Sequence, residues 1–115
     1  LLLHQVFLNM VINAEHAVAA TGKNGCIEIS TSVAPSGDRI VATLRDTGVG
    51  IPEDTLSRIF EPFYTTKEVG KGTGLGLAIT YGIVQEHGGQ IVAANHPEGG
   101  AVFTVELPIA PSPGR

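Results

Sequence analysis

The stretch RDTGVGIP, residues 45–52, is the part of this sequence that decides the fold. It follows an alternating apolar segment and carries one acid, Asp46, into a turn with two glycines and a proline. An acid at the end of a strand, beside glycines, is suited to accept a hydrogen bond from a flat polar ligand such as a purine amino group. The alternative is an ordinary turn aspartate that closes a hairpin strand.

Alternating apolar and polar residues predict four strands around this turn. They cover 26–33 and 39–46, joined by the turn PSGD, and 90–95 and 101–108, joined by PEGG. Helical periodicity predicts helices over 1–20 and 75–87, and a short helix, EDTLSRIF, is expected after Pro52. These elements predict an α+β two-layer sandwich, in which about three helices cover one face of a mostly antiparallel, mixed sheet.

Composition indicates one soluble domain, over residues 1–108, with a disordered tail at 109–115. The net charge of −4, without any run of lysine or arginine, argues against a nucleic-acid partner. No apolar stretch approaches the roughly 20 residues that a membrane span needs. The single cysteine, Cys26, lies in an alternating segment and is expected to be a small buried strand residue.

Residues 61–74 have little periodicity, are rich in Gly, Thr and Lys, and are expected to form a long loop. Loops of this length in a compact domain are usually functional. The stretch KGTGLGL, residues 71–77, places three glycines directly before a helix, where backbone N–H groups and the positive helix end favour an anion. It matches neither the Walker pattern nor GxGxxG, so a flexible linker is the alternative.

The first predicted helix carries a polar stripe of Gln5, Asn9, Asn13 and His16, flanked by apolar residues. A buried amide without partners costs about 1–3 kcal/mol, so two stacked asparagines indicate that a polar group meets them. An amide oxygen is also a suitable ligand for Mg²⁺. The alternative is that these side chains bond to neighbouring loops or face water.

Four motifs, NMVINA, DTGVG, FEPFYTT and GKGTGLGL, occur in this order within residues 4–108. Together they resemble the ATP-binding catalytic domain of sensor histidine kinases, which belong with gyrase, MutL and the heat-shock chaperone ATPases in the GHKL class. The resemblance implies a Bergerat-type sandwich. In that fold ATP lies between the first helix, the Asp46 turn and the long loop, which serves as a lid.

The resemblance also assigns roles to single positions. Asn13 matches the Mg²⁺-binding asparagine, Asn9 the polar residue one turn earlier, and Asp46 the acid that recognises the adenine amino group. Asn9, Asn13 and Lys67 are the expected catalytic residues, although the resemblance does not choose between Lys67 and Lys71 for the phosphates. The other expected nucleotide contacts are His16, which stands where many members have lysine, Gly48, Gly50, Ile51, Phe60, Gly70, Gly72, Thr73, Gly74, Leu75, Gly76 and Leu77.

The activity implied by the resemblance is transfer of the γ-phosphate of Mg-ATP to a histidine on a separate dimerisation domain, with a response regulator downstream. A glutamate that activates water in the ATPases of the class is replaced by Asn9, which predicts slow ATP hydrolysis. None of the four histidines precedes Asp or Glu, which is the acceptor pattern of the family. We therefore expect a domain that does not phosphorylate itself. The resemblance also implies N-terminal truncation, because the family's domain usually starts with a strand and an aspartate before the first helix. We expect the domain to be monomeric and cytoplasmic. The alternatives are a GHKL protein-serine kinase of the anti-sigma or mitochondrial type, and a degenerate nucleotide sensor.

Overall fold

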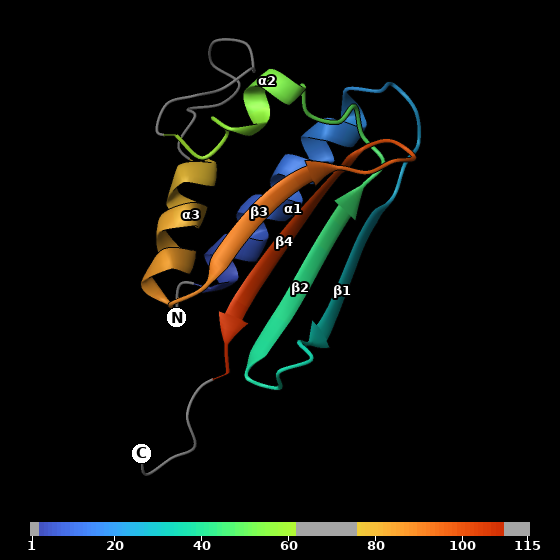
Figure 1. Cartoon of the computed structure of the whole chain (residues 1–115). Helices are drawn as coiled ribbons and strands as arrows, with labels where there is room; N and C mark the ends of the chain where they lie inside the picture. The colour runs from blue at the N-terminus through green and yellow to red at the C-terminus, as the bar shows by residue number, and fades with distance from the viewer. Residues whose placement is uncertain (1–2, 62–75, 110–115) are drawn as a thin grey trace.

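The computed structural model describes residues 3–61 and 76–109, which form two layers (Figure 1). The elements in chain order are α1 (Leu3–Ala19), β1 (Ile27–Val33), β2 (Arg39–Asp46), α2 (Glu53–Leu56), α3 (Gly76–Glu86), β3 (Gln90–Asn95) and β4 (Ala101–Pro108). Most of the expected loop and tail, at 62–75 and 110–115, lies outside the described residues. In the part that is described, no helix is long and apolar enough to cross a bilayer.

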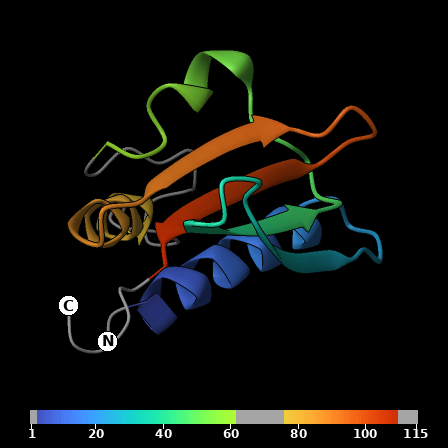
Figure 2. The same ribbon diagram turned by 60° about the horizontal axis from the view of Figure 1, so that its bottom comes forward.

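The four strands form one sheet in the order β1-β2-β4-β3, and each described pairing is antiparallel. Contacts join α1 to β2 and α3 to β3, and the two helices lie side by side on one face of the sheet. The four-residue α2 lies apart from α1, beyond β3 (Figure 2). The α+β sandwich with its antiparallel sheet is confirmed, and α2 is shorter than the eight-residue segment that the sequence indicated.

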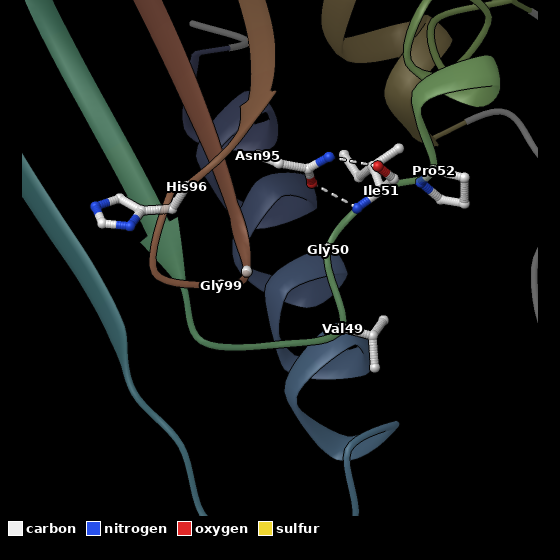
Figure 3. A pocket seen from close by; sticks show the side chains of 8 residues that line it. Val49, Gly50, Ile51, Pro52, Asn95, His96 and Gly99 are labelled. Carbon is white, nitrogen blue, oxygen red and sulfur yellow. Dashed lines mark hydrogen bonds between the residues drawn. The ribbon is translucent and has the colours of Figure 1, made fainter.

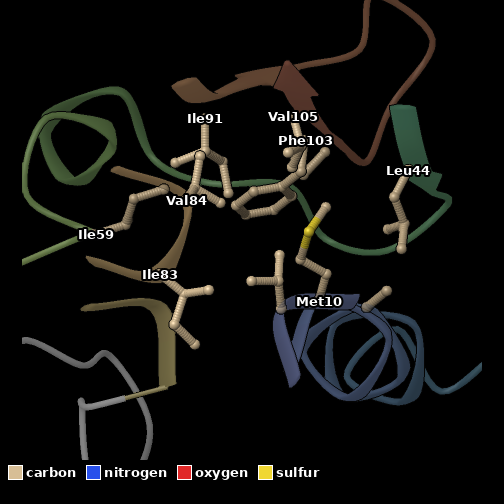
Figure 4. Packing of buried hydrophobic residues seen from close by; sticks show 11 residues of the cluster. Met10, Leu44, Ile59, Ile83, Val84, Ile91, Phe103 and Val105 are labelled. Carbon is tan, nitrogen blue, oxygen red and sulfur yellow. The ribbon is translucent and has the colours of Figure 1, made fainter. Parts of the chain in front are cut away.

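The hydrophobic core lies between the helices and the sheet (Figure 4). Val6 and Met10 of α1, Leu44 of β2, Val84 of α3 and Val105 of β4 are each at most 1% exposed. Burial of an apolar side chain of this size contributes about 1.5–3 kcal/mol relative to leaving it in water. The core therefore fixes both long helices to one face of the sheet.

The edge strand β1 departs from the expected burial. Ile29 is paired with the buried Leu44 and points to the same side of the sheet, yet it is 55% exposed. The helices lie mainly against β2 and β3, and α1 makes fewer contacts with β1, so this edge is largely open. Cys26 precedes β1 and is exposed, so the prediction of a buried cysteine is wrong. Alternation identifies the two faces of a strand, but it does not tell how far a helix extends over one of them.

Candidate functional site

Asp46 is the last residue of β2 and is 2% exposed. Its Oδ1 accepts hydrogen bonds from the backbone N–H groups of Gly48, at 2.8 Å, and Ala101, at 3.2 Å. Among the described residues, none donates a hydrogen bond to Oδ2. A carboxylate has about four acceptor sites, so Asp46 joins β2 to β4 through one oxygen, and the acceptor sites of the other are not used by a described residue.

The turn after Asp46 lies against α1. A Cβ atom on Gly48 would lie 2.6 Å from the Cβ of Ala17, a distance that real side chains do not reach. Ala17 follows Asn13 by four residues, so both lie on the same face of α1. Gly48 therefore contacts the face of α1 that also carries Asn13. Gly48 is required for this contact whether or not a ligand approaches the turn.

Asn9 connects α1 to α3. Its Oδ1 accepts a hydrogen bond from Nε2 of Gln5, at 3.1 Å, and its Nδ2 donates one to Oγ1 of Thr80, at 3.2 Å. Thr80 lies in α3 and is fully buried. A polar group does meet the Asn9 amide, and it is a hydroxyl of a neighbouring helix. Sequence reasoning missed Thr80, because a threonine inside the apolar run AITYGIV resembles an ordinary core residue.

Replacing Thr80 with valine keeps the side-chain shape and removes this hydroxyl. We expect the free energy of unfolding to fall by about 1 kcal/mol, because the Asn9 amide loses an acceptor. Chemical denaturation of Thr80→Val, Asn9→Ala and the double variant gives the coupling energy of the pair. A coupling energy of zero would show that the hydrogen bond between α1 and α3 contributes nothing.

Asn13 and His16 follow Asn9 along the same helix. Asn13 is half-buried, and its side chain forms no hydrogen bond with a described residue, whereas His16 is exposed. Across residues 3–61 and 76–109, no group of three or more His, Cys, Asp or Glu is placed to hold a metal ion. A Mg²⁺ ion commonly uses one or two protein oxygens and takes water and phosphate oxygens for the rest, so the single amide of Asn13 fits such an ion.

Aromatic contacts hold Phe60 against α3 and β4. The ring of Phe60 stacks on Tyr81 of α3, with centroids 5.5 Å apart, and meets Phe103 of β4 edge-on at 6.4 Å. Ile51 and Leu77 both pack against the hydrophobic core. The remaining expected nucleotide contacts, Lys67, Gly70, Lys71, Gly72, Thr73, Gly74 and Leu75, lie outside the described residues, and Gly76 is the first residue of α3.

A hollow of about 290 Å³ lies beside the turn that follows Asp46 (Figure 3). Its lining comes from the segment after the turn and from the β3–β4 connection: Val49, Gly50, Ile51, Pro52, Asn95, His96, Gly99 and Gly100. At this hollow the Asn95 side chain binds the backbone of Ile51, whose N–H donates to Oδ1 at 2.7 Å and whose carbonyl accepts from Nδ2 at 2.6 Å. No sequence pattern predicts this pair, because 44 positions separate the two residues.

Comparison with known proteins identifies the family of the chain. Residues 1–111 match the family described as "Histidine kinase-, DNA gyrase B-, and HSP90-like ATPase". The chain is 40% identical over 114 residues to the sensor kinase CckA of Brucella abortus, in an alignment that covers 90% of this chain. It spans only 12% of the length of that relative.

Solved structures extend the likeness to the fold. The catalytic domain of histidine kinase ThkA matches with a TM-score of 0.75 and 41% identity, over 93% of this chain and 67% of that one. ThkA in complex with the response regulator protein TrrA matches with a TM-score of 0.71 and 36% identity, over 95% of this chain and 29% of that one. The chain therefore belongs to the histidine kinase-, DNA gyrase B- and HSP90-like ATPase family and is a catalytic ATP-binding domain of the sensor histidine kinase type.

Proposed function

We propose that this domain binds ATP with Mg²⁺ and transfers the γ-phosphate to a histidine on a separate dimerisation domain of its parent protein. The observation that carries the proposal is the buried carboxylate of Asp46, in which one oxygen is held by two backbone amides and the other is left for a ligand. This arrangement occurs in a chain whose family consists of ATP-binding domains.

Recognition of adenine is assigned to Oδ2 of Asp46. The hydrogen bonds from Gly48 and Ala101 orient the carboxylate, so that Oδ2 accepts from the exocyclic amino group of the base. Guanine carries a carbonyl oxygen at the corresponding ring position, and two acceptors facing each other repel. The proposed site therefore selects adenine over guanine nucleotides.

The phosphate groups are assigned to Asn13 of α1 and to the lysines and glycines that precede α3 in the sequence. Asn13 would hold Mg²⁺ through its amide oxygen, and the ion would supply charge neutralisation on the phosphate oxygens. Lys67 or Lys71 is proposed to contact the same oxygens. The glycines at 72, 74 and 76 are proposed to offer backbone N–H groups, which bind anions well directly before a helix.

Transfer needs alignment of donor and acceptor more than a catalytic base. The bond between the γ-phosphorus and the ADP oxygen breaks while a bond to an imidazole nitrogen of the acceptor forms. Asn9 cannot serve as an efficient base towards water, because an amide has little basicity and its two polar atoms already bond to Gln5 and Thr80. This supports slow hydrolysis of ATP when no acceptor is present.

A phosphate-transfer assay tests the proposal. In it, this chain is incubated with labelled ATP and the dimerisation domain of its parent protein. The acceptor is expected to carry a label that is stable in alkali and lost in acid, and this chain alone is expected to stay unlabelled. A label that survives acid instead would identify a serine kinase. Nucleotide binding without any transfer would identify a sensor module, and either result would overturn the proposal. Passage of the phosphate to a response regulator is proposed as the following step.

The Mg²⁺ assignment predicts a specific defect in Asn13→Ala. Calorimetric titration with ATP, with and without Mg²⁺, should show that the affinity gained from the ion falls about tenfold in this variant, because an inner ligand is lost. Affinity without Mg²⁺ should stay close to that of the unmodified chain. The matched control is Asn24→Ala, which removes an exposed amide from the loop after α1. An equal dependence on Mg²⁺ in both variants would contradict the assignment.

A further inference from the structure

We infer that Asn95, through its hydrogen bonds to the backbone of Ile51, is a positioning residue for the nucleotide site. The inference rests on the proposed function, because it concerns the turn that begins at Asp46. Asn95 is the last residue of β3, and Ile51 lies five positions after Asp46, between β2 and α2. Asn95 was not among the residues assigned to the site from the sequence.

The Asn95 side chain binds both backbone groups of Ile51, as the backbone of a neighbouring strand would. The planar Asn95 amide presents one acceptor and one donor to a single residue, at 2.7 Å from the Ile51 nitrogen and 2.6 Å from its oxygen. Figure 3 shows the amide directed from the end of β3 at the backbone of Ile51. Because both backbone groups are bound, the position and the orientation of this residue are fixed together.

The two anchors of the turn come from the same hairpin. At its start, Oδ1 of Asp46 binds the N–H of Ala101, the first residue of β4. At its end, Ile51 is bound by Asn95, the last residue of β3. The β3–β4 hairpin therefore holds both ends of the segment between Asp46 and Ile51.

The backbone of Gly50, which precedes Ile51, also lies close to the Asn95 amide. Its φ of +79° belongs to the left-handed region, which disfavours residues with a side chain. A Cβ atom at this position would lie 3.0 Å from Oδ1 of Asn95, so the amide sits close against the backbone before Ile51. The neighbouring Val49 is 63% exposed, and burial of its side chain therefore does little to hold the segment.

Because Asn95 is exposed, its effect on the nucleotide site can be distinguished from an effect on the stability of the whole domain. Because water can replace its hydrogen bonds when the amide is removed, the loss should affect overall stability little. The side chain of Ile51, however, packs against the core beside the proposed adenine site. A released Ile51 backbone would therefore change the wall of that site while the sheet stays intact.

Calorimetric titration with ATP·Mg²⁺ at a temperature well below unfolding tests the inference. Asn95→Asp has nearly the same shape but places an oxygen against the Ile51 carbonyl, and Asn95→Ala removes both partners. In each variant we expect ATP to bind about tenfold more weakly, with a midpoint of thermal unfolding close to that of the unmodified chain. Hydrogen exchange of the Ile51 amide in the nucleotide-free chain should become faster in Asn95→Ala, which removes its acceptor. Asn24→Ala, with an exposed amide removed elsewhere, should change none of these quantities.

The outcomes separate this inference from the proposed function. If the unmodified chain binds ATP and the Asn95 variants bind it equally well, the positioning role is overturned while the proposed function stands. A loss of affinity that appears only where the variant is partly unfolded also overturns it, because general stability then explains the result. If the unmodified chain does not bind ATP, both the inference and the proposed function fail.

Discussion

The Asp46→Asn variant is expected to bind ATP about 100-fold more weakly than the unmodified chain while it keeps its fold. The amide oxygen of asparagine can accept both backbone hydrogen bonds, from Gly48 and Ala101, that Oδ1 of Asp46 accepts. The opposite orientation would set an NH₂ group against two N–H donors, so it is disfavoured. The NH₂ group must then replace Oδ2, where it opposes the amino group of adenine.

Calorimetric titration with ATP·Mg²⁺ and GTP·Mg²⁺ measures this effect, and thermal unfolding shows whether the fold is retained. Asp38→Asn is the matched control, because it makes the same chemical change at an exposed residue in the β1–β2 turn. Its affinity for ATP should equal that of the unmodified chain. Unchanged binding in Asp46→Asn, or equal affinity of the unmodified chain for both nucleotides, would refute the role given to Asp46.

The Gly100→Ala variant should lose about 3–5 kcal/mol of unfolding free energy, and with it nucleotide binding. Gly100 has a φ of +81°, and a Cβ atom there would lie 2.0 Å from the carbonyl oxygen of Asp46 and 2.8 Å from the carbonyl carbon. Backbone cannot yield as a flexible side chain does. The β3–β4 hairpin would have to move away from the end of β2, which breaks the hydrogen bond between Asp46 and Ala101.

Gly37→Ala separates this contact from backbone strain alone. Gly37 has a nearly identical φ of +79°, but a Cβ atom there would meet nothing within 4 Å. The control variant should therefore lose only about 1 kcal/mol, the usual cost of a side chain in the left-handed region. Chemical denaturation of both variants gives the difference. Equal losses would show that the contact between Gly100 and Asp46 does not limit stability.

The strands β2 and β4 could be predicted well because their residues alternate between the two faces of the sheet. On β4, Phe103 and Val105 are buried while Val102 and Thr104 are half-buried, and the strand has the bounds that the pattern indicated. The same pattern could not show that β1 is a partly uncovered edge. That property depends on where α1 crosses the sheet, which is decided by packing between distant segments.

The short helix after Pro52 shows how tertiary contacts override a local pattern. The run EDTLSRIF can continue as a helix, but α2 ends at Leu56. Ile59 is nonetheless buried, and Phe60 packs on Tyr81 and Phe103. The chain leaves the helix after Leu56, and Ile59 then lies in the core while Phe60 packs against it.

The candidate site was predictable to the extent that its residues lie within short motifs. Asp46 and Asn13 were assigned through such motifs, and the structure places the Asp46 turn against α1 one turn after Asn13. Thr80 and Asn95 were not found, because each acts on a residue far away in the sequence and belongs to a segment that looks like ordinary helix or strand. Their roles depend on which elements become neighbours, and the order of residues alone does not specify this.

The double anchoring of Oδ1 in Asp46 has a consequence for how a base is captured. The rotational freedom of this carboxylate is lost when the chain folds, so a base that enters later does not have to immobilise it. Such a preorganised receptor selects its partner by the direction of a lone pair. It does not adapt its shape to the molecule that enters.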